Sequence, residues 1–168
     1  MTTKITNIKT YISKKVNSLL LFCRCYSKNT ENIVVSIPQD IEWKDTIPFV
    51  APINQGRCIK VYDGDTITIA AKLPYKSSPI YRFSVRLNGI DTPEIRAKCP
   101  AEKEMAYKAR DFIRSILNNG KRIELHNLDR GKYFRIVADI YVDDVNVAEL
   151  MIEKGLGKPY EENIDWCS

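Results

Sequence analysis

The alternation of apolar and polar side chains predicts short strands in the chain from residue 57 onward. Ile67 and Ile69 alternate with threonines, which is the period-2 pattern of a half-buried strand. A second alternating segment has apolar positions at Tyr81, Phe83, Val85 and Leu87. Arg86 lies between them, so it belongs to the opposite face of that strand.

The longest helix is predicted over residues 101–118. Pro100 suits the first helical position, and Gly120 suits the exit. One side of this helix carries apolar residues at the helical spacing, namely Met105, Ala109, Phe112, Ile113, Ile116 and Leu117.

Two more strands are predicted at 122–128 and 135–142, joined by a basic loop at 129–133. A second, shorter helix is predicted over 147–154. Its expected caps are Asn146 at the N-cap, Glu149 at the capping-box position and Gly155 at the exit.

This order of elements predicts an α+β fold that is mainly β. Five short strands with one long helix between the third and fourth are typical of a small OB-fold barrel, here with a short second helix. Residues 55–168 are predicted to form this domain. Residues 1–54 are predicted to be a basic tail followed by an irregular linker, in which Pro38, Pro48 and Pro52 interrupt regular structure.

The first thirty residues contain no Asp or Glu and are rich in Lys, Ser and Thr. Their apolar patch at 19–23 is too short for a membrane span, which takes roughly twenty apolar residues. Three interpretations stay open: an organelle transit peptide, a peripheral membrane anchor acylated at Cys23 or Cys25, and a simple basic tail. A cytoplasmic protein is the default, with organelle targeting and membrane association as alternatives.

Composition adds limited information about partners. The chain has 168 residues, 44% hydrophobic and 28% charged, which fits a soluble globular protein that is expected to be a monomer. A net charge of +5 favours acidic partners such as nucleic acid, or only aids solubility. With no Cys-x-x-Cys pair and one histidine, a Cys/His zinc site is excluded. Whether Cys99 and Cys167 pair cannot be read from the sequence.

Two acidic turns carry the candidate chemistry. Asp63-Gly64-Asp65-Thr66 and Asp91-Thr92-Pro93 each follow or precede a predicted strand. Carboxylate and carbonyl oxygens at such turns can hold a hard divalent cation such as calcium. Asp65 and Asp91 are the candidate ligands, and Asp63 could orient a metal-bound water. The alternative is that these turn residues only cap their own backbone.

Arg86, Arg135 and Glu94 complete the candidate site. A guanidinium matches the geometry of a phosphodiester under attack, so the two arginines are candidate phosphate clamps. A carboxylate beside a metal can take the proton of an attacking water, which makes Glu94 the candidate general base. Both Arg86 and Glu94 are expected to be exposed. The alternative is that they are ordinary surface residues.

These motifs, in their order and spacing, closely resemble the staphylococcal nuclease (thermonuclease) family. The resemblance rests on three segments: Asp63-Gly64-Asp65-Thr66, Arg86-Leu87-Asn88-Gly89-Ile90-Asp91-Thr92-Pro93-Glu94 and Lys132-Tyr133-Phe134-Arg135. It covers about residues 57–160, and the element Arg-x4-Asp-Thr-Pro-Glu is its most specific part.

The resemblance implies a calcium-dependent phosphodiesterase that hydrolyses DNA and RNA with little sequence preference. It implies cleavage of the P–O5′ bond, which leaves 3′-phosphate ends. The main-chain carbonyl of Thr92 would join Asp65 and Asp91 as a calcium ligand. Lys132, Tyr133 and Tyr160 would contact the substrate. The alternative function is a catalytically silent OB-fold module that only binds nucleic acid or protein.

Two departures from the family pattern affect these expectations. Phe134 stands where the family usually has a small residue, so it is expected to narrow the pocket or to alter the loop geometry. The chain also stops at Ser168, which leaves no room for a long C-terminal helix. Neither departure removes one of the candidate catalytic groups.

Overall fold

The structure is a computed structural model that describes residues 36–117, 121–162 and 165–167. The chain divides into two units, Met1–Thr46 and Ile47–Ser168. The described part of the first unit contains one 3-10 turn, η1 (Trp43–Asp45). The alternatives predicted for residues 1–30 lie outside the described residues. No helix in the described ranges is long and apolar enough to cross a membrane.

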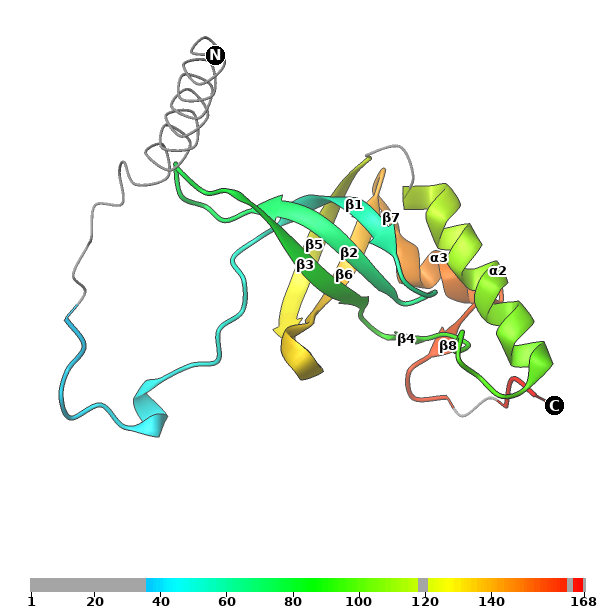
Figure 1. The fold of residues 1–168 in the computed structure, drawn as a ribbon, viewed down its shortest axis with the longest axis horizontal. Coiled ribbons are helices and arrows are strands. Elements are labelled where there is room, and N and C mark those ends of the chain that lie inside the picture. Colours follow the sequence, from blue (N-terminus) through cyan, green and yellow to red (C-terminus); the bar gives the residue numbers. More distant parts are fainter. Residues whose placement is uncertain (1–35, 118–120, 163–164, 168) are drawn as a thin grey trace, which may run out of the picture. The chain divides into compact units, whose positions relative to one another are not determined.

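The second unit is built around a closed barrel of five strands (Figure 1). The barrel strands are β1 (Gln55–Val61), β2 (Thr66–Lys72), β3 (Ile80–Leu87), β5 (Arg122–Arg130) and β6 (Ile136–Val142). Neighbours pair antiparallel except β3 and β6, whose parallel pairing closes the barrel. The long helix lies between the third and fourth barrel strands. The predicted α+β, mainly β, OB-fold barrel is therefore confirmed.

Alternating side chains form the interior of the barrel. Ile67 and Ile69 of β2 are fully buried, as their spacing predicts. In β3 the apolar stripe is buried only at its C-terminal half, where Val85 and Leu87 join the core while Tyr81 stays exposed. The core thus fixes the end of β3 that carries Arg86, since the flanking residues Val85 and Leu87 cannot move independently of the barrel.

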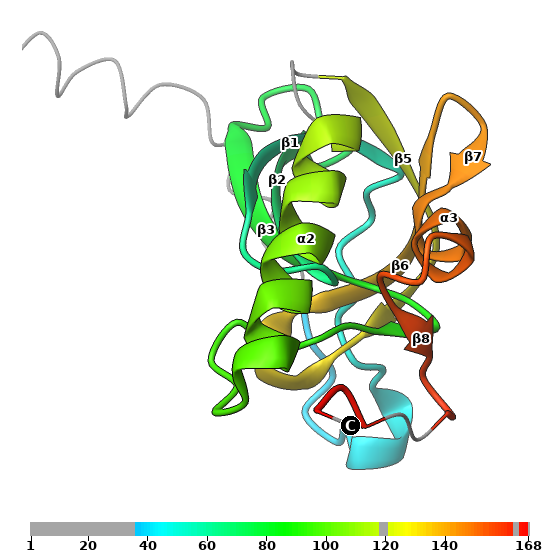
Figure 2. The ribbon, with the colours of Figure 1, turned by 90° about the vertical axis from the view of Figure 1, so that its right-hand side faces the viewer.

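The helix α2 (Pro100–Leu117) lies across one end of the barrel (Figure 2). Pro100 is its first residue, as predicted. Its fully buried residues are Ala106, Ala109, Ile113 and Leu117. Ala106 was missed by the sequence prediction, because the buried stripe is centred on small residues that allow the helix to approach the barrel closely. Met105, Phe112 and Ile116 border this stripe and are half-buried.

The second helix, α3 (Val147–Glu153), follows the two-residue strand β7 (Val145–Asn146). The Asn146 side chain accepts hydrogen bonds from the Ala148 and Glu149 backbone N–H groups, so the predicted N-cap is confirmed. Glu149 differs from the predicted capping box, because its carboxylate accepts from the Asn146 side-chain amide. Gly155 has a φ of +67°, as expected for a helix exit.

A short pair of strands lies beside the barrel. β4 (Ile90–Asp91) pairs antiparallel with β8 (Lys158–Pro159), which brings the C-terminal part of the chain to the second acidic turn. Gly157 allows this approach, since a Cβ there would lie 2.4 Å from the Ile90 side chain.

Candidate active site

The two acidic turns lie against each other at the end of the barrel that α2 covers. A Cβ on Gly64 would lie 2.9 Å from Thr92 Oγ1 and 2.9 Å from the Ala109 side chain. Such contacts are closer than carbon atoms tolerate, so only glycine lets the first turn reach both the second turn and the helix. The Asp-Gly-Asp spacing therefore has a packing role besides any chemical one.

Arg86 links the two turns. Its Nη1 lies 2.6 Å from Asp65 Oδ2, and its Nη2 lies 3.2 Å from Asp91 Oδ1 and 3.5 Å from the Ile90 carbonyl oxygen. Its side chain is 21% exposed, so the expectation that Arg86 is exposed was wrong. The alternation of β3 does place Arg86 outside the apolar stripe, but the acidic turns then cover it.

Asp65 is 4% exposed, and its environment disfavours its charge. Burial, and next the Asp63 carboxylate, raise the pKa of Asp65 to about 7, against the opposing pull of Arg86. Thr66 Oγ1 donates to Asp65 Oδ1 at 2.7 Å. The Asp65 N–H donates to Asp63 Oδ1 at 3.4 Å, so the Asp63 side chain helps to hold the backbone of Asp65 in place. An added cation would relieve the repulsion between these two carboxylates.

Lys158 is a site residue that the sequence did not indicate. It is buried, and its Nζ lies 3.7 Å from Asp91 Oδ2, on the opposite side of the carboxylate from Arg86. Its position depends on the pairing of β4 with β8. Each of these strands has two residues, which is too short for a pattern that sequence reading could detect.

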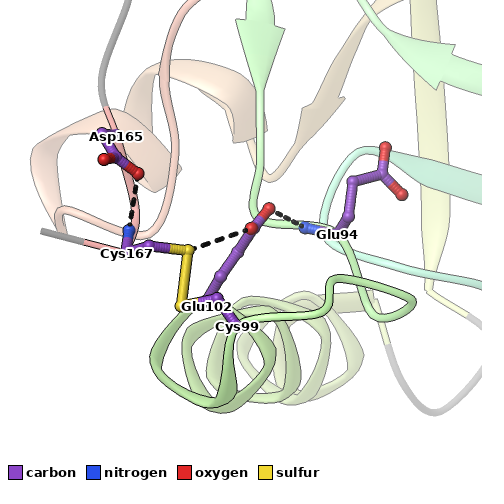
Figure 3. The surroundings of a disulfide bond; sticks show 5 residues. All are labelled: Glu94, Cys99, Glu102, Asp165 and Cys167. Carbon is purple, nitrogen blue, oxygen red and sulfur yellow. Dashed lines mark hydrogen bonds between the residues drawn. A yellow bond between two sulfur atoms is a disulfide. The ribbon is translucent and has the colours of Figure 1, made fainter.

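Glu94 is exposed, as expected, and its backbone is held in place by helix α2. Glu102 Oε1 accepts a hydrogen bond from the Glu94 N–H at 3.2 Å (Figure 3). Partial burial raises the pKa of Glu94, and the Asp63 and Asp91 carboxylates raise it further, while Arg86 opposes them. A carboxylate whose pKa is raised is a stronger proton acceptor for hydrolysis than an ordinary one.

A disulfide stands next to this contact. Cys99 and Cys167 are joined, with their Cα atoms 6.0 Å apart, so the pairing that the sequence left open is present. Cys167 Sγ lies 3.7 Å from Glu102 Oε2, and the Cys167 N–H donates to Asp165 Oδ1 (Figure 3). The disulfide thus ties the C-terminal part of the chain to the start of α2, beside the residue that holds Glu94.

The second arginine reaches the site through the barrel topology. β3 and β6 run parallel with Val85 opposite Ile136, so Arg135, just before β6, lies near the end of β3 that carries Arg86. Arg135 follows the 3-10 turn η2 (Lys132–Phe134), in which Tyr133 and Phe134 both have positive φ values. This backbone conformation is rare for residues other than glycine.

An open pocket of about 720 Å³ collects most of the candidate residues. This volume lies within the usual range of ligand pockets, ~300–1,000 Å³. The predicted site residues that line it are Arg86, Asp91, Glu94, Lys132, Arg135 and Tyr160. Asp63, Asp65 and Thr92 are buried and do not line the pocket. Asp65 contacts Arg86, and Thr92 lies against Gly64.

The Tyr133 and Phe134 side chains do not line this pocket. Tyr133 is 89% exposed and does not line the pocket. Phe134 lies under the Arg130 guanidinium, 5.7 Å from it, and lines a different pocket. The expectation that Phe134 narrows the candidate pocket was therefore wrong, whereas the unusual loop geometry is present as the two positive φ values.

The donor atoms suit a hard cation. Asp65, Asp91 and the Thr92 carbonyl offer only oxygen, which calcium and magnesium prefer. In the described ranges, no group of three or more His, Cys, Asp or Glu side chains is arranged to hold a metal ion. Two carboxylates and one carbonyl would therefore need water molecules to complete a coordination shell.

Comparisons with known proteins place the chain in a family. The family model described as "Staphylococcal nuclease homologue" matches residues 84–166. An "Uncharacterized endonuclease" of Escherichia coli is 30% identical over 116 residues, which cover 68% of this chain and 67% of that protein. This chain belongs to the staphylococcal nuclease family.

Plant relatives of the family match a shorter region. A "Staphylococcal-like nuclease" of Arabidopsis thaliana is 37% identical, and a "Probable staphylococcal-like nuclease" of Oryza sativa subsp. japonica is 35% identical, each over 79 residues. These matches cover 47% of this chain and 22% of each plant protein. The family and the names of these relatives support a nuclease.

Proposed function

We propose that this member of the staphylococcal nuclease family hydrolyses the phosphodiester bonds of DNA and RNA with little sequence preference. The observation that carries the proposal is the Arg86 guanidinium, which joins Asp65 and Asp91 at the edge of a pocket that Glu94 and Arg135 also line. In this proposal these residues would supply oxygens for a cation, guanidinium groups for a phosphate and a proton acceptor.

Calcium is the proposed cofactor, with Asp65, Asp91 and the Thr92 carbonyl as its ligands. Asp63 would orient a water molecule of the coordination shell. When bound, the ion supplies positive charge that stabilises the extra negative charge of the phosphate under attack. Its binding also favours the ionised form of Asp65, whose pKa is otherwise raised to about 7.

The arginines bind the phosphate in this proposal. A guanidinium has five N–H donors, and the contacts of Arg86 with Asp65, Asp91 and Ile90 leave donors for a phosphate oxygen. Arg135 lines the same pocket as Arg86. Lys132, Tyr133 and Tyr160 would contact the nucleotide, although Tyr133 must turn toward the pocket to do so.

Glu94 takes the proton of the attacking water. The water oxygen bonds to phosphorus as the P–O5′ bond breaks, so the products carry 3′-phosphate and 5′-hydroxyl ends. The raised pKa of Glu94 suits this role, because it makes the carboxylate a stronger base than an ordinary glutamate.

A cleavage assay with end-group analysis tests the proposal. We expect labelled single-stranded DNA and RNA to be cut in calcium but not in EDTA, and the products to carry 3′-phosphates. Glu94→Gln is the matched variant, because it keeps the shape of the side chain and removes its basicity. If well-folded protein binds these strands without cutting them in calcium, the chain is a binding module and the proposal fails.

A further inference from the structure

A second pocket lies on the other side of Arg135. It has a volume of about 230 Å³ and lies between the segment before β1, the end of β5 and the η2 turn. Its aromatic lining consists of Phe49, Phe83 and Phe134. This volume is below the ~300 Å³ of the smallest usual ligand pockets, so it suits one flat ring rather than a whole nucleotide.

Two of the three aromatic rings at this pocket are exposed to solvent, while Phe83 is half-buried against the core. Phe134 is 90% exposed and Phe49 is 73% exposed. Exposing such rings forgoes the favourable free energy that their burial would give. Ala51 and Ile136 beneath them are buried, so the rings stand on the barrel core.

The charges around the rings favour an anionic partner. The Arg130 guanidinium lies 5.7 Å from the centre of the Phe134 ring, and Arg135 lines the pocket as well. Asp129 is the one acidic residue in the lining. Its Oδ1 accepts a hydrogen bond from the Arg130 N–H at 2.6 Å, so part of its charge is already bound.

We propose that this aromatic pocket, defined by Phe49, Phe83 and Phe134 with Arg130, receives a base of single-stranded nucleic acid. Arg135 lines both this pocket and the candidate active site. A strand whose phosphate contacts Arg135 therefore continues directly to the exposed rings. Each base presents a flat π-face, so stacking on phenylalanine requires no particular sequence.

The pocket favours single strands over duplexes. In a duplex both faces of a base are stacked on its neighbours, so a ring on the protein cannot reach them. Arg130 would contact the phosphate next to the stacked base or stack on it directly. The inference rests on the proposed function, which brings a nucleic-acid strand to the active site. The base binding that it predicts does not require that the strand is cleaved.

Binding in EDTA separates the two proposals. We expect Phe134→Ala and Phe49→Ala each to weaken the affinity of the full chain for a fluorescent single-stranded oligonucleotide about 5- to 100-fold, which corresponds to the stacking free energy of one base. Affinity for an abasic oligonucleotide of the same length, which carries the phosphates but no base that could stack, should not change. Phe134→Trp should keep the affinity, since the ring is retained.

Tyr107 provides the matched control. It also lies beneath an arginine, with the Arg110 guanidinium 4.7 Å from its ring, but it lines neither pocket. Tyr107→Ala should leave binding of both oligonucleotides unchanged.

Three results would overturn the inference. Equal weakening for the abasic strand and the base-carrying strand would mean that the Phe134 variant only displaces Arg135. Unchanged affinity in both alanine variants would remove the stacking role. A loss of thermal stability with unchanged affinity would show that part of this chain, rather than a base, covers the rings. If the alanine variants weaken binding as expected but the protein does not cleave the strand, only the proposed function is overturned.

Discussion

The two arginines of the candidate site have opposite surroundings. Arg86 lies within the barrel sheet, and carboxylates on two different turns hold its guanidinium. Arg135 follows a turn whose two preceding residues have positive φ values and are almost fully exposed. The Arg86 side of the pocket is therefore held by ion pairs within the fold, whereas half-buried Arg135 follows directly on an exposed turn.

Replacing each arginine should therefore affect stability and activity to different extents. Removing a group that is fixed by the fold should affect both, because its partners remain buried. Removing a group that contacts mainly solvent should affect activity alone.

Arg86→Ala should have the largest effect. Cleavage should fall by about 10³- to 10⁵-fold, as is usual for an arginine that binds a phosphate under transfer. The free energy of unfolding should fall by about 3 kcal/mol, since Asp65 is left buried without its partner. Urea unfolding at about pH 8, where Asp65 is ionised, measures this loss. Unchanged stability would show that the pair with Asp65 contributes nothing.

Arg135→Ala should reduce cleavage by a similar factor, about 10³- to 10⁵-fold. Its free energy of unfolding should stay within about 0.5 kcal/mol of the parent protein, because half-buried Arg135 makes no ion pair with a carboxylate in the described residues. The cleavage assay and urea unfolding at about pH 8 measure these two quantities. A stability loss as large as that of Arg86→Ala would contradict the contrast between the two sides.

Cys167→Ser tests how much the disulfide to Cys99 stabilises the region that holds Glu94. The disulfide closes a loop with a sequence separation of 68, so its loss should lower the free energy of unfolding by about 3–4 kcal/mol. Denaturation with and without a reductant measures it. The reductant should destabilise the parent protein and leave the variant unchanged. Equal sensitivity in the two proteins would mean that another reducible feature is responsible.

The stability of the protein without calcium should also depend on pH through Asp65. Asp65 keeps its proton in the folded state up to about pH 7, whereas its ordinary pKa is 3.8. The folded state then binds more protons, so this contribution is complete below about pH 4 and is lost as the pH rises through about 7. Unfolding in EDTA across this range should show the fall, and Asp65→Asn should lack it. An unchanged slope in the variant would assign the effect to another group.

The barrel could be predicted from the sequence because its signals are local. Alternation in β2 and β3 and the capping residues of α3 each lie within a few neighbouring positions. The contacts that could not be predicted join segments far apart in the chain. The burial of Arg86 depends on two turns that meet at Gly64, and Lys158 depends on the pairing of β8 with β4.

The candidate site was likewise predictable only in part. Motif spacing identified six residues that line the pocket, because the family resemblance carries their order: Arg86, Asp91, Glu94, Lys132, Arg135 and Tyr160. It did not indicate that Phe134 turns toward Arg130 and away from the pocket, since that depends on the backbone conformation of η2.

The central claim is that the two acidic turns and Arg86 form one site for a cation and a phosphate. Calorimetric titration of calcium into the full chain, compared with its Asp65→Asn variant, tests this claim most directly. We expect one calcium ion to bind the parent protein, and to bind more tightly when a non-cleavable dinucleotide is present. The variant should lose this binding while it stays folded. Equal calcium binding by both proteins would contradict the account.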